Sequence, residues 1–117
     1  MGNRAPPRTS RSVTQANRVI ELDATVAQAH AIRAASLMEL SQDAEALNSA
    51  RNAVRLEPTA WQHRLIEARL LMKLDDAEAA ALTIRALPAE LRSANLLLAT
   101  TYADALEAIQ RPAEAAE

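Results

Sequence analysis

The chain has 117 residues, a formal net charge of −2 and no cysteine, and half of its residues are hydrophobic. One domain is expected at this length. Phe is absent, and Trp and Tyr occur once each. Alanine and leucine dominate the apolar residues, and both are strong helix formers, whereas strands favour β-branched and aromatic residues. The composition therefore predicts helices packed on helices.

Several classes of function are excluded at once. Without cysteine there is no disulfide, zinc–thiolate site or thiol nucleophile. Gly2 is the only glycine, so the glycine-dependent phosphate loops and nucleophile elbows are absent. The negative net charge and the scarcity of aromatic residues argue against nucleic-acid binding. No apolar run approaches the roughly 18 residues of a spanning helix, so no direct membrane insertion is expected. The redox argument leaves the cytoplasm and the periplasm equally open.

The few residues that could take part in catalysis or metal binding have structural explanations. His30 and His63 cannot form a zinc-type pair, and His30 is expected to be a solvated surface histidine. Asp75 and Asp76 lie at an expected helix start, where acids complement the helix dipole, and Asp75 with Glu78 has the spacing of a capping box. No acid–base couple or activated nucleophile is apparent, so the chain is predicted not to be an enzyme and to need no metal or cofactor.

The first residues in chain order are basic and rich in proline and serine. Arg4, Arg8 and Arg11 lie among these residues, and residues 1–12 are expected to be a disordered basic leader, with a functional basic arm as the alternative. Residues 13–22 are expected to form the second helix of a hairpin whose first helix is missing.

An internal repeat follows. Three pairs of segments match, namely 43–46 with 76–79, 37–40 with 71–74 and 20–25 with 54–59. All three pairs agree on a shift of about 34 residues, a period typical of helical-repeat proteins. A further copy of the first segment lies at 112–115. Agreement among independent segments indicates a true structural repeat.

Each repeat predicts a helical hairpin. Thr25 and Thr59 each have Gln at the third position after them, as in a capping box, and are expected to start the first helices. Apolar stripes with helical spacing follow, and Pro58 and Pro88 punctuate the exits. Hairpins are therefore expected over about 25–57, 60–87 and 89–117. In the last one a continuous first helix is expected over 91–110, at an angle shifted by the early Pro88.

This pattern resembles the tetratricopeptide repeat (TPR) family over about residues 13–117. The residues that carry the likeness are Ala46, Ala53, Pro58, Ala79, Ala86, Ala115 and the segment 98–102. The repeats depart from the family where its first-helix aromatic is replaced by Ala31, Leu65 and Asn95, and where Arg69 stands in place of a small residue. The resemblance implies an all-α fold, an α-α superhelix of about three helical hairpins.

The resemblance also implies a concave groove, lined by the first helices, that holds a peptide or an amphipathic helix of a partner. The groove residues carried over are Ile32, Ser36, Glu39, His63, Ile66, Leu70, Lys73, Leu96 and Thr100. The alternative is that the apolar members pack against a neighbouring hairpin. The groove interpretation expects Ile66→Glu or Leu70→Glu to abolish partner capture without loss of helical content.

The function expected from these observations is a protein–protein interaction scaffold or adaptor. The alternative is a non-catalytic TPR segment of a larger enzyme or of an envelope or polysaccharide export machine, acting as a spacer. A third hypothesis is self-association into a homo-oligomer through the exposed ends of the stack.

Overall fold

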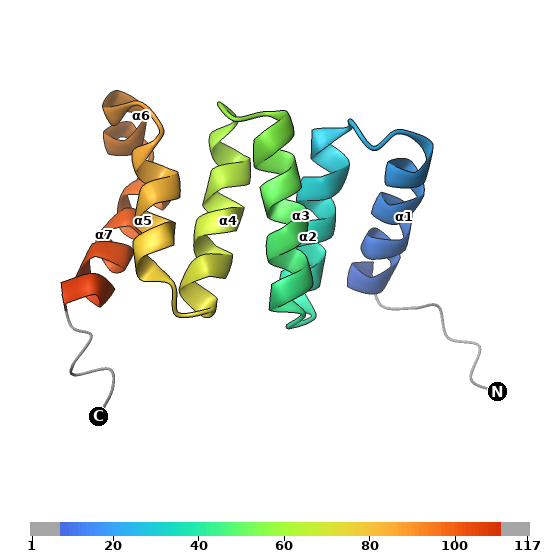
Figure 1. Ribbon diagram of the computed structural model, residues 1–117, viewed down its shortest axis with the longest axis horizontal. Coiled ribbons are helices and arrows are strands. Elements are labelled where there is room, and N and C mark those ends of the chain that lie inside the picture. The colour runs from blue at the N-terminus through green and yellow to red at the C-terminus, as the bar shows by residue number, and fades with distance from the viewer. Residues whose placement is uncertain (1–7, 111–117) are drawn as a thin grey trace.

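The computed structural model describes residues 8–110, which form a row of helices (Figure 1). The helices are α1 (Arg8–Leu22), α2 (Ala27–Glu39), α3 (Asp43–Leu56), α4 (Trp61–Lys73), α5 (Ala77–Arg85), α6 (Ala89–Ala94) and α7 (Leu96–Gln110). No strand occurs in this part of the chain. The expected all-α stack of hairpins is confirmed.

The helices alternate between two roles. The pairs α2/α3 and α4/α5 are antiparallel hairpins, so α2 and α4 are first helices and α3 and α5 are second helices. By the same repeat register α1 is a second helix and α7 is a first helix. Figure 1 shows α1 at one end of the row and α6 with α7 at the other, and the molecule is 51 Å long in its longest dimension.

Alanine forms much of the contact between helices. Ala34, Ala46, Ala68 and Ala80 are completely buried, and they belong to four successive helices. A small side chain lets two helix backbones approach closely, and the larger Leu70, Ile84 and Leu98 fill the remaining space of the core. The alanine-rich composition is thus what allows hairpins to stack this tightly.

A cluster of polar side chains ties the first repeat to its neighbour. Arg33 of α2 donates from Nε to Asn17 Oδ1 of α1 at 2.7 Å and from Nη1 to the Ser49 hydroxyl of α3. Its Nη2 also lies 3.7 Å from a Glu45 carboxylate oxygen. One side chain therefore joins three successive helices.

The second repeat has an equivalent cluster with the charge reversed. Glu67 of α4 accepts a hydrogen bond from the Thr83 hydroxyl of α5 at 2.5 Å, and its other oxygen lies 3.7 Å from Arg51 Nε of α3. Each of these three positions lies one repeat period beyond its counterpart in the first cluster. The repeat period seen in the sequence is therefore also the period of the contacts between helices.

The hairpin turns repeat as well. Ser41 and Asp75, one repeat period apart, both have a φ of 61°, in the left-handed region. After α2, the Ser41 N–H donates to Met38 O and the Gln42 N–H to Leu37 O. This pattern is a Schellman motif, which satisfies carbonyls at the helix end. The turn normally takes glycine at the left-handed position, and this chain provides none there.

The predicted capping boxes are wrong. The residues that precede α2 and α4 are Val26 and Ala60, and neither makes a side-chain cap. Thr25 instead donates its N–H and hydroxyl to the Asp23 carboxylate, at 3.0 and 2.6 Å. These two hydrogen bonds lower the pKa of Asp23 below its ordinary value because they favour the charged carboxylate. Thr25 closes the preceding turn, because a short polar side chain prefers local backbone partners there.

The start of α5 also differs from the expectation. Asp76 is its N-cap and accepts from the Ala79 N–H at 3.2 Å, while Asp75 occupies the left-handed turn position. The expected N-cap, Asp75, is therefore one residue too early, because Asp75 occupies the left-handed position of the turn.

Two helix boundaries correct the predicted organisation. Helix α1 begins at Arg8, so residues 8–12 are helical and are not a disordered leader; residues 1–7 lie outside the described part. The continuous helix expected over 91–110 is interrupted at Asn95, which has extended backbone angles and accepts from the Leu98 N–H at 3.2 Å. Asparagine is a favoured N-cap, so it starts α7 and ends α6. Residues 111–117 of the third predicted hairpin lie outside the described residues.

Candidate protein-binding surface

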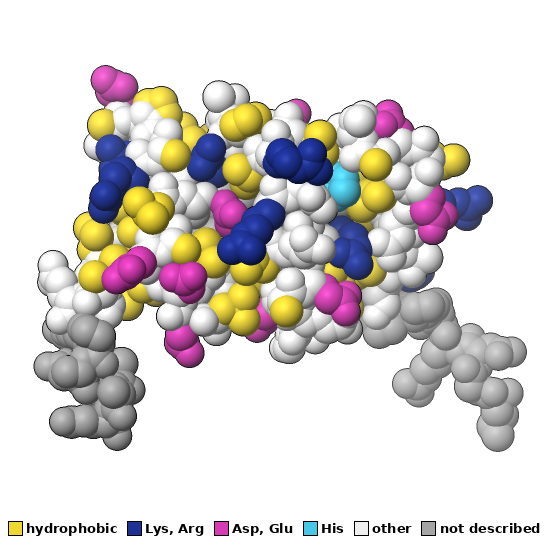
Figure 2. All heavy atoms as spheres, in the orientation of Figure 1, with side chains coloured by type: hydrophobic (Ala, Val, Ile, Leu, Met, Phe, Trp, Pro, Cys, Tyr) yellow, Lys and Arg dark blue, Asp and Glu magenta, His cyan; other side chains and the backbone are white. Residues whose placement is uncertain are grey.

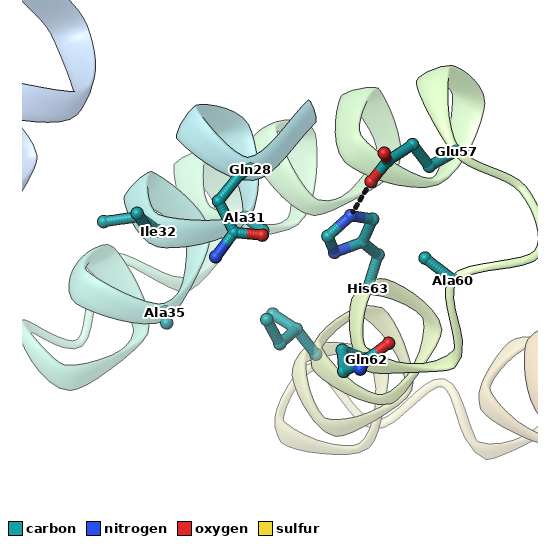
Figure 3. Close-up of a pocket in the computed structure, with 9 residues that line it drawn as sticks. Gln28, Ala31, Ile32, Ala35, Glu57, Ala60, Gln62 and His63 are labelled. Atoms are coloured by element: carbon teal, nitrogen blue, oxygen red, sulfur yellow. Dashed lines mark hydrogen bonds and ion pairs between the residues drawn. The ribbon is translucent and has the colours of Figure 1, made fainter. Parts of the chain in front are cut away.

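The first helices α2 and α4 enclose a pocket between them, which we call the α2–α4 pocket (Figure 3). It has a volume of about 460 Å³. Its lining residues are Gln28, Ala31, Ile32, Ala35, Glu57, Ala60, Gln62, His63 and Ile66. The walls are mainly small or branched apolar side chains, with two amides, a carboxylate and an imidazole among them. A pocket of this composition suits an apolar side chain flanked by polar backbone groups.

His63 is the buried polar group of this pocket. Its side chain is only 4% exposed, and Nε2 lies 2.7 Å from Glu57 Oε1. Because a carboxylate only accepts, Nε2 carries the hydrogen of this contact. Nδ1 is buried and has no hydrogen-bond partner. Figure 3 shows the ring held below Glu57, which follows the end of α3, and facing residues of α2 across the pocket.

A second hollow lies among α2, α4 and α7, and we call it the α4–α7 pocket. It has a volume of about 520 Å³ and is lined by Met38, Arg69, Met72, Lys73, Thr100, Thr101 and Asp104. It is more polar than the α2–α4 pocket. Lys73 Nζ forms an ion pair with Asp43 Oδ1 of α3 at 3.2 Å, so its charge is already partnered.

The structure divides the nine predicted groove residues into four groups. Ile32, His63 and Ile66 line the α2–α4 pocket, and Lys73 and Thr100 line the α4–α7 pocket. Leu96 and Glu39 are exposed outside both pockets, and Glu39 accepts a hydrogen bond from the Thr9 hydroxyl of α1. Ser36 and Leu70 are buried.

Leu70 is therefore not part of an accessible surface. It is completely buried within the main core cluster, where a charged substitution would disrupt packing. Ser36 is 8% exposed and is buried as well. Both residues lie on first helices. These helices pack against neighbours on several sides, so only part of the face that was predicted to line the groove reaches solvent. The expectation that Leu70→Glu would leave the fold intact is withdrawn for this reason.

The prediction for His30 is also wrong. Its side chain is 7% exposed, and its Nε2 donates to the Ala24 carbonyl at 2.9 Å. Arg64, at the equivalent position of the next repeat, donates in the same way to the Pro58 carbonyl at 2.7 Å. His30 is therefore a structural residue that holds the loop before α2 onto that helix.

The residues that sequence reasoning missed are the amides and the small residues of the α2–α4 pocket. Gln28 and Gln62 had a visible signal, their separation by one repeat period, but the same signal also fits a capping pattern. Ala35 gave no signal, because an alanine at helical spacing looks the same in a core and in a pocket wall. Glu57 lies beyond the end of α3, where the helical spacing of apolar residues no longer applies.

Charged side chains occupy much of the remaining surface. Figure 2 shows basic and acidic side chains on the same face, with apolar side chains in small groups between them. Within residues 8–110 there is no cluster of three or more side chains suited to hold a metal ion. No helix in the same range combines the length and the apolar character required to cross a bilayer.

Comparison with known proteins gives a likeness in structure and none in sequence. No protein-family model matches the chain, and no curated protein matches it in sequence. Among solved structures, the chain is similar to a structure titled as the TPR2B-domain:pHsp70 complex of yeast Sti1, with a TM-score of 0.76. The identity is 18%, and the match covers 85% of this chain and 83% of that one. The chain thus has the fold of a tetratricopeptide repeat domain, with hairpins stacked as an α-α superhelix.

Proposed function

We propose that the chain is a protein-interaction module that binds an extended peptide segment of a partner across its first helices. The observation that carries this proposal is the α2–α4 pocket, a mainly apolar hollow between two successive first helices that also presents the amides of Gln28 and Gln62.

The pocket chemistry defines the preferred ligand. Ala31, Ala35 and Ile66 form an apolar wall that accepts a medium-sized apolar side chain. The amides of Gln28 and Gln62 both donate and accept, so they match the N–H and C=O groups of an extended backbone. The ligand is therefore an extended peptide that carries a medium-sized apolar residue.

The likeness to the Sti1 domain supports a protein partner in general, because that solved structure is a complex with pHsp70. The α4–α7 pocket provides a second contact for the same peptide, since it lies on the same row of first helices. Lys73 contributes little to specificity for a carboxylate, because Asp43 already compensates its charge.

Ala35 offers a way to close the α2–α4 pocket without disturbing the fold. Its equivalent in the next repeat is the exposed Arg69, so the backbone at this register accommodates arginine. Ala35→Arg is expected to fill the pocket and to weaken peptide binding at least about tenfold, because burial of one apolar side chain contributes about 1.5–3 kcal/mol. The measurement starts with selection of binding peptides from a phage-displayed random library on the purified chain. Fluorescence polarisation of the selected peptides then gives the dissociation constants.

The matched control is Ala44→Arg, the same change at an exposed position of α3 outside both pockets. This variant should bind the selected peptides as the unmodified chain does, and circular dichroism should show equal helical content for all three proteins. The proposal is wrong if no peptide is enriched, or if Ala35→Arg binds the selected peptides as tightly as Ala44→Arg.

A further inference from the structure

The charged side chains of α4 differ in whether they have a partner. Lys73 pairs with a carboxylate of α3, Glu67 accepts a hydrogen bond from a hydroxyl of α5, and Arg64 donates to backbone carbonyls. Arg69 is exposed, and no hydrogen bond or ion pair joins it to any other residue between 8 and 110. Within the described residues, the guanidinium of Arg69 is therefore free to bind another group.

The lack of a partner sets Arg69 apart from the other arginines of helices α2 to α7. Each of those arginines contacts a side chain, a carbonyl group or an aromatic ring. They are Arg33, Arg51, Arg55, Arg64, Arg85 and Arg92. Intramolecular contacts thus account for the other arginines of these helices, and they do not account for Arg69.

Arg69 lies on the surface that the proposed peptide crosses. It lines the α4–α7 pocket, and Ile66, three residues earlier on the same helix, lines the α2–α4 pocket. Residues three apart share a helix face, with about 5–6 Å between their Cβ atoms. The positions one repeat period before and after Arg69 are Ala35 and Ala103. A single long cationic side chain therefore lies next to the apolar pocket, at a register that otherwise has small residues.

We propose that Arg69 selects peptides that carry one acidic side chain close to the apolar residue held in the α2–α4 pocket. This inference rests on the proposed function and adds the charge of the partner segment. A guanidinium can bind a carboxylate through two parallel hydrogen bonds, and it does not lose its charge. Alternate side chains of an extended segment lie about 7 Å apart on the same side. The acidic residue is therefore expected two or four positions from the apolar one.

Asp104 restricts this preference to a single acidic residue. It lines the α4–α7 pocket from α7, is exposed, and forms no ion pair with Arg69. A second peptide carboxylate on the α7 side of Arg69 would lie near Asp104 and be repelled. Lys73 does not offset this repulsion, because its charge is paired with Asp43. The expected ligand is thus an apolar residue with one nearby acid, and not a run of acidic residues.

The net charge of the chain separates this local recognition from general electrostatic attraction. The formal net charge is −2, so the overall field favours basic peptides over acidic ones. A preference for an acidic residue at one fixed position has to come from a nearby cation. The contact with an exposed arginine should also weaken as salt is added.

Peptide selection from one phage-displayed random library, on the unmodified chain and on two variants, tests the proposal. Arg69→Ala introduces the residue found at the equivalent position of both neighbouring repeats, so the fold should persist, with equal helical content by circular dichroism. Arg55→Ala is the matched control, because Arg55 is exposed on α3 and lines neither pocket. The unmodified chain and Arg55→Ala should enrich Asp or Glu near a shared apolar residue, and Arg69→Ala should not.

Fluorescence polarisation with one selected acidic peptide, and with the same peptide carrying the matching amide, completes a double-mutant cycle with Arg69→Ala. The unmodified chain should bind the acidic peptide about fivefold more tightly than the amide peptide, as expected for one well-formed exposed ion pair. Arg69→Ala should bind both peptides equally. Arg69→Glu should prefer a version of the peptide with lysine at the acidic position.

The outcomes separate this inference from the proposed function. Enriched peptides without an acidic excess would overturn the role of Arg69 and leave the α2–α4 pocket as the binding site. The same holds if the acidic excess persists on Arg69→Ala, or if that variant weakens the acidic and amide peptides equally. Failure of the unmodified chain to enrich any peptide would contradict the proposed function and this inference together.

Discussion

The two hairpin turns show the conformational cost that single residues carry in this fold. Ser41 and Asp75 are both held at a φ of 61°. A side chain with a Cβ is disfavoured in that region, and aspartate tolerates it better than serine because its short side chain can bond locally. Ser41 is therefore the more strained of the two positions.

Replacing Ser41 by glycine should stabilise the fold. Glycine adopts the left-handed region without steric cost, although it also gains freedom in the unfolded chain, so the net increase in the free energy of unfolding is expected to be about 0.5 kcal/mol. Urea unfolding followed by circular dichroism gives this value from the shift in midpoint at constant slope.

Ser93→Gly is the matched comparison, because Ser93 is exposed inside α6 and its hydroxyl donates to the Ala89 carbonyl at 2.9 Å. There the same substitution should destabilise by about 0.5 kcal/mol, since glycine is a poor helix former. Equal destabilisation by both substitutions would show that the turn conformation at Ser41 carries no strain.

Individual site residues were the least predictable feature of this chain. Leu70 and Ile66 lie one turn apart on the same helix, yet Leu70 is completely buried and Ile66 lines a pocket. Helical spacing places both on one face, but a first helix packs against several neighbours, and the boundary between covered and open surface depends on their side chains. His30 was misassigned because its partner is a backbone carbonyl, which leaves no trace in the sequence.

At the scale of the helices, the two polar clusters occupy the same repeat positions, although the residue types and the sign of the central charge differ. Position 33 is an arginine that donates to its neighbours, and position 67 is a glutamate that receives from them. The sequence repeat could not reveal this equivalence, because a comparison of residue types scores arginine against glutamate as a mismatch. What is preserved is a long polar side chain that reaches both adjacent second helices.

Glu67 is expected to contribute much more to stability than Arg51. The Glu67 side chain is 13% exposed and the Arg51 side chain is 58% exposed. Glu67→Ala leaves the Thr83 hydroxyl without its acceptor and should lower the free energy of unfolding by about 1–3 kcal/mol. Arg51→Ala removes only an exposed ion pair and should cost about 0.5 kcal/mol or less. Chemical denaturation of the two variants measures both values.

The double variant Glu67→Ala, Arg51→Ala completes this comparison as a double-mutant cycle. A coupling energy between Glu67 and Arg51 that exceeded the whole effect of Glu67→Ala would contradict the dominant role given to Thr83. In that case the salt bridge, and not the hydroxyl, would hold α4 to its neighbours.

The sequence predicted which segments form helices better than it predicted the residues at which each helix begins and ends. The second helix expected over 43–56 agrees with α3, because a dense alanine ladder and an acidic first turn define it. The break at Asn95 was missed because the apolar pattern runs across it, and a cap within a periodic segment is visible only through its backbone conformation. Pro88 lies between the end of α5 at Arg85 and the start of α6 at Ala89.

For the whole molecule, the repeat period was enough to predict the topology. Residues one period apart occupy equivalent places in the stack. The pair Thr9–Glu39 joins α1 to α2, and the pair Asp43–Lys73, one repeat period later, joins α3 to α4. The pockets were not predictable in the same way. The repeat period makes the spaces between successive helices equivalent, but the size of each space depends on the particular side chains that fill it.

Stability is expected to be graded along the stack, since each hairpin contacts only its neighbours. Ala16 is the only buried residue of α1, and α6 has none, whereas α2 to α5 contain most of the core. Hydrogen exchange followed by mass spectrometry should therefore show the slowest exchange in α2 to α5 and faster exchange in α1, α6 and the exposed side of α7. Uniform exchange along the whole stack of the unmodified chain would mean that the hairpins unfold as one cooperative unit, and the graded model would have to be abandoned.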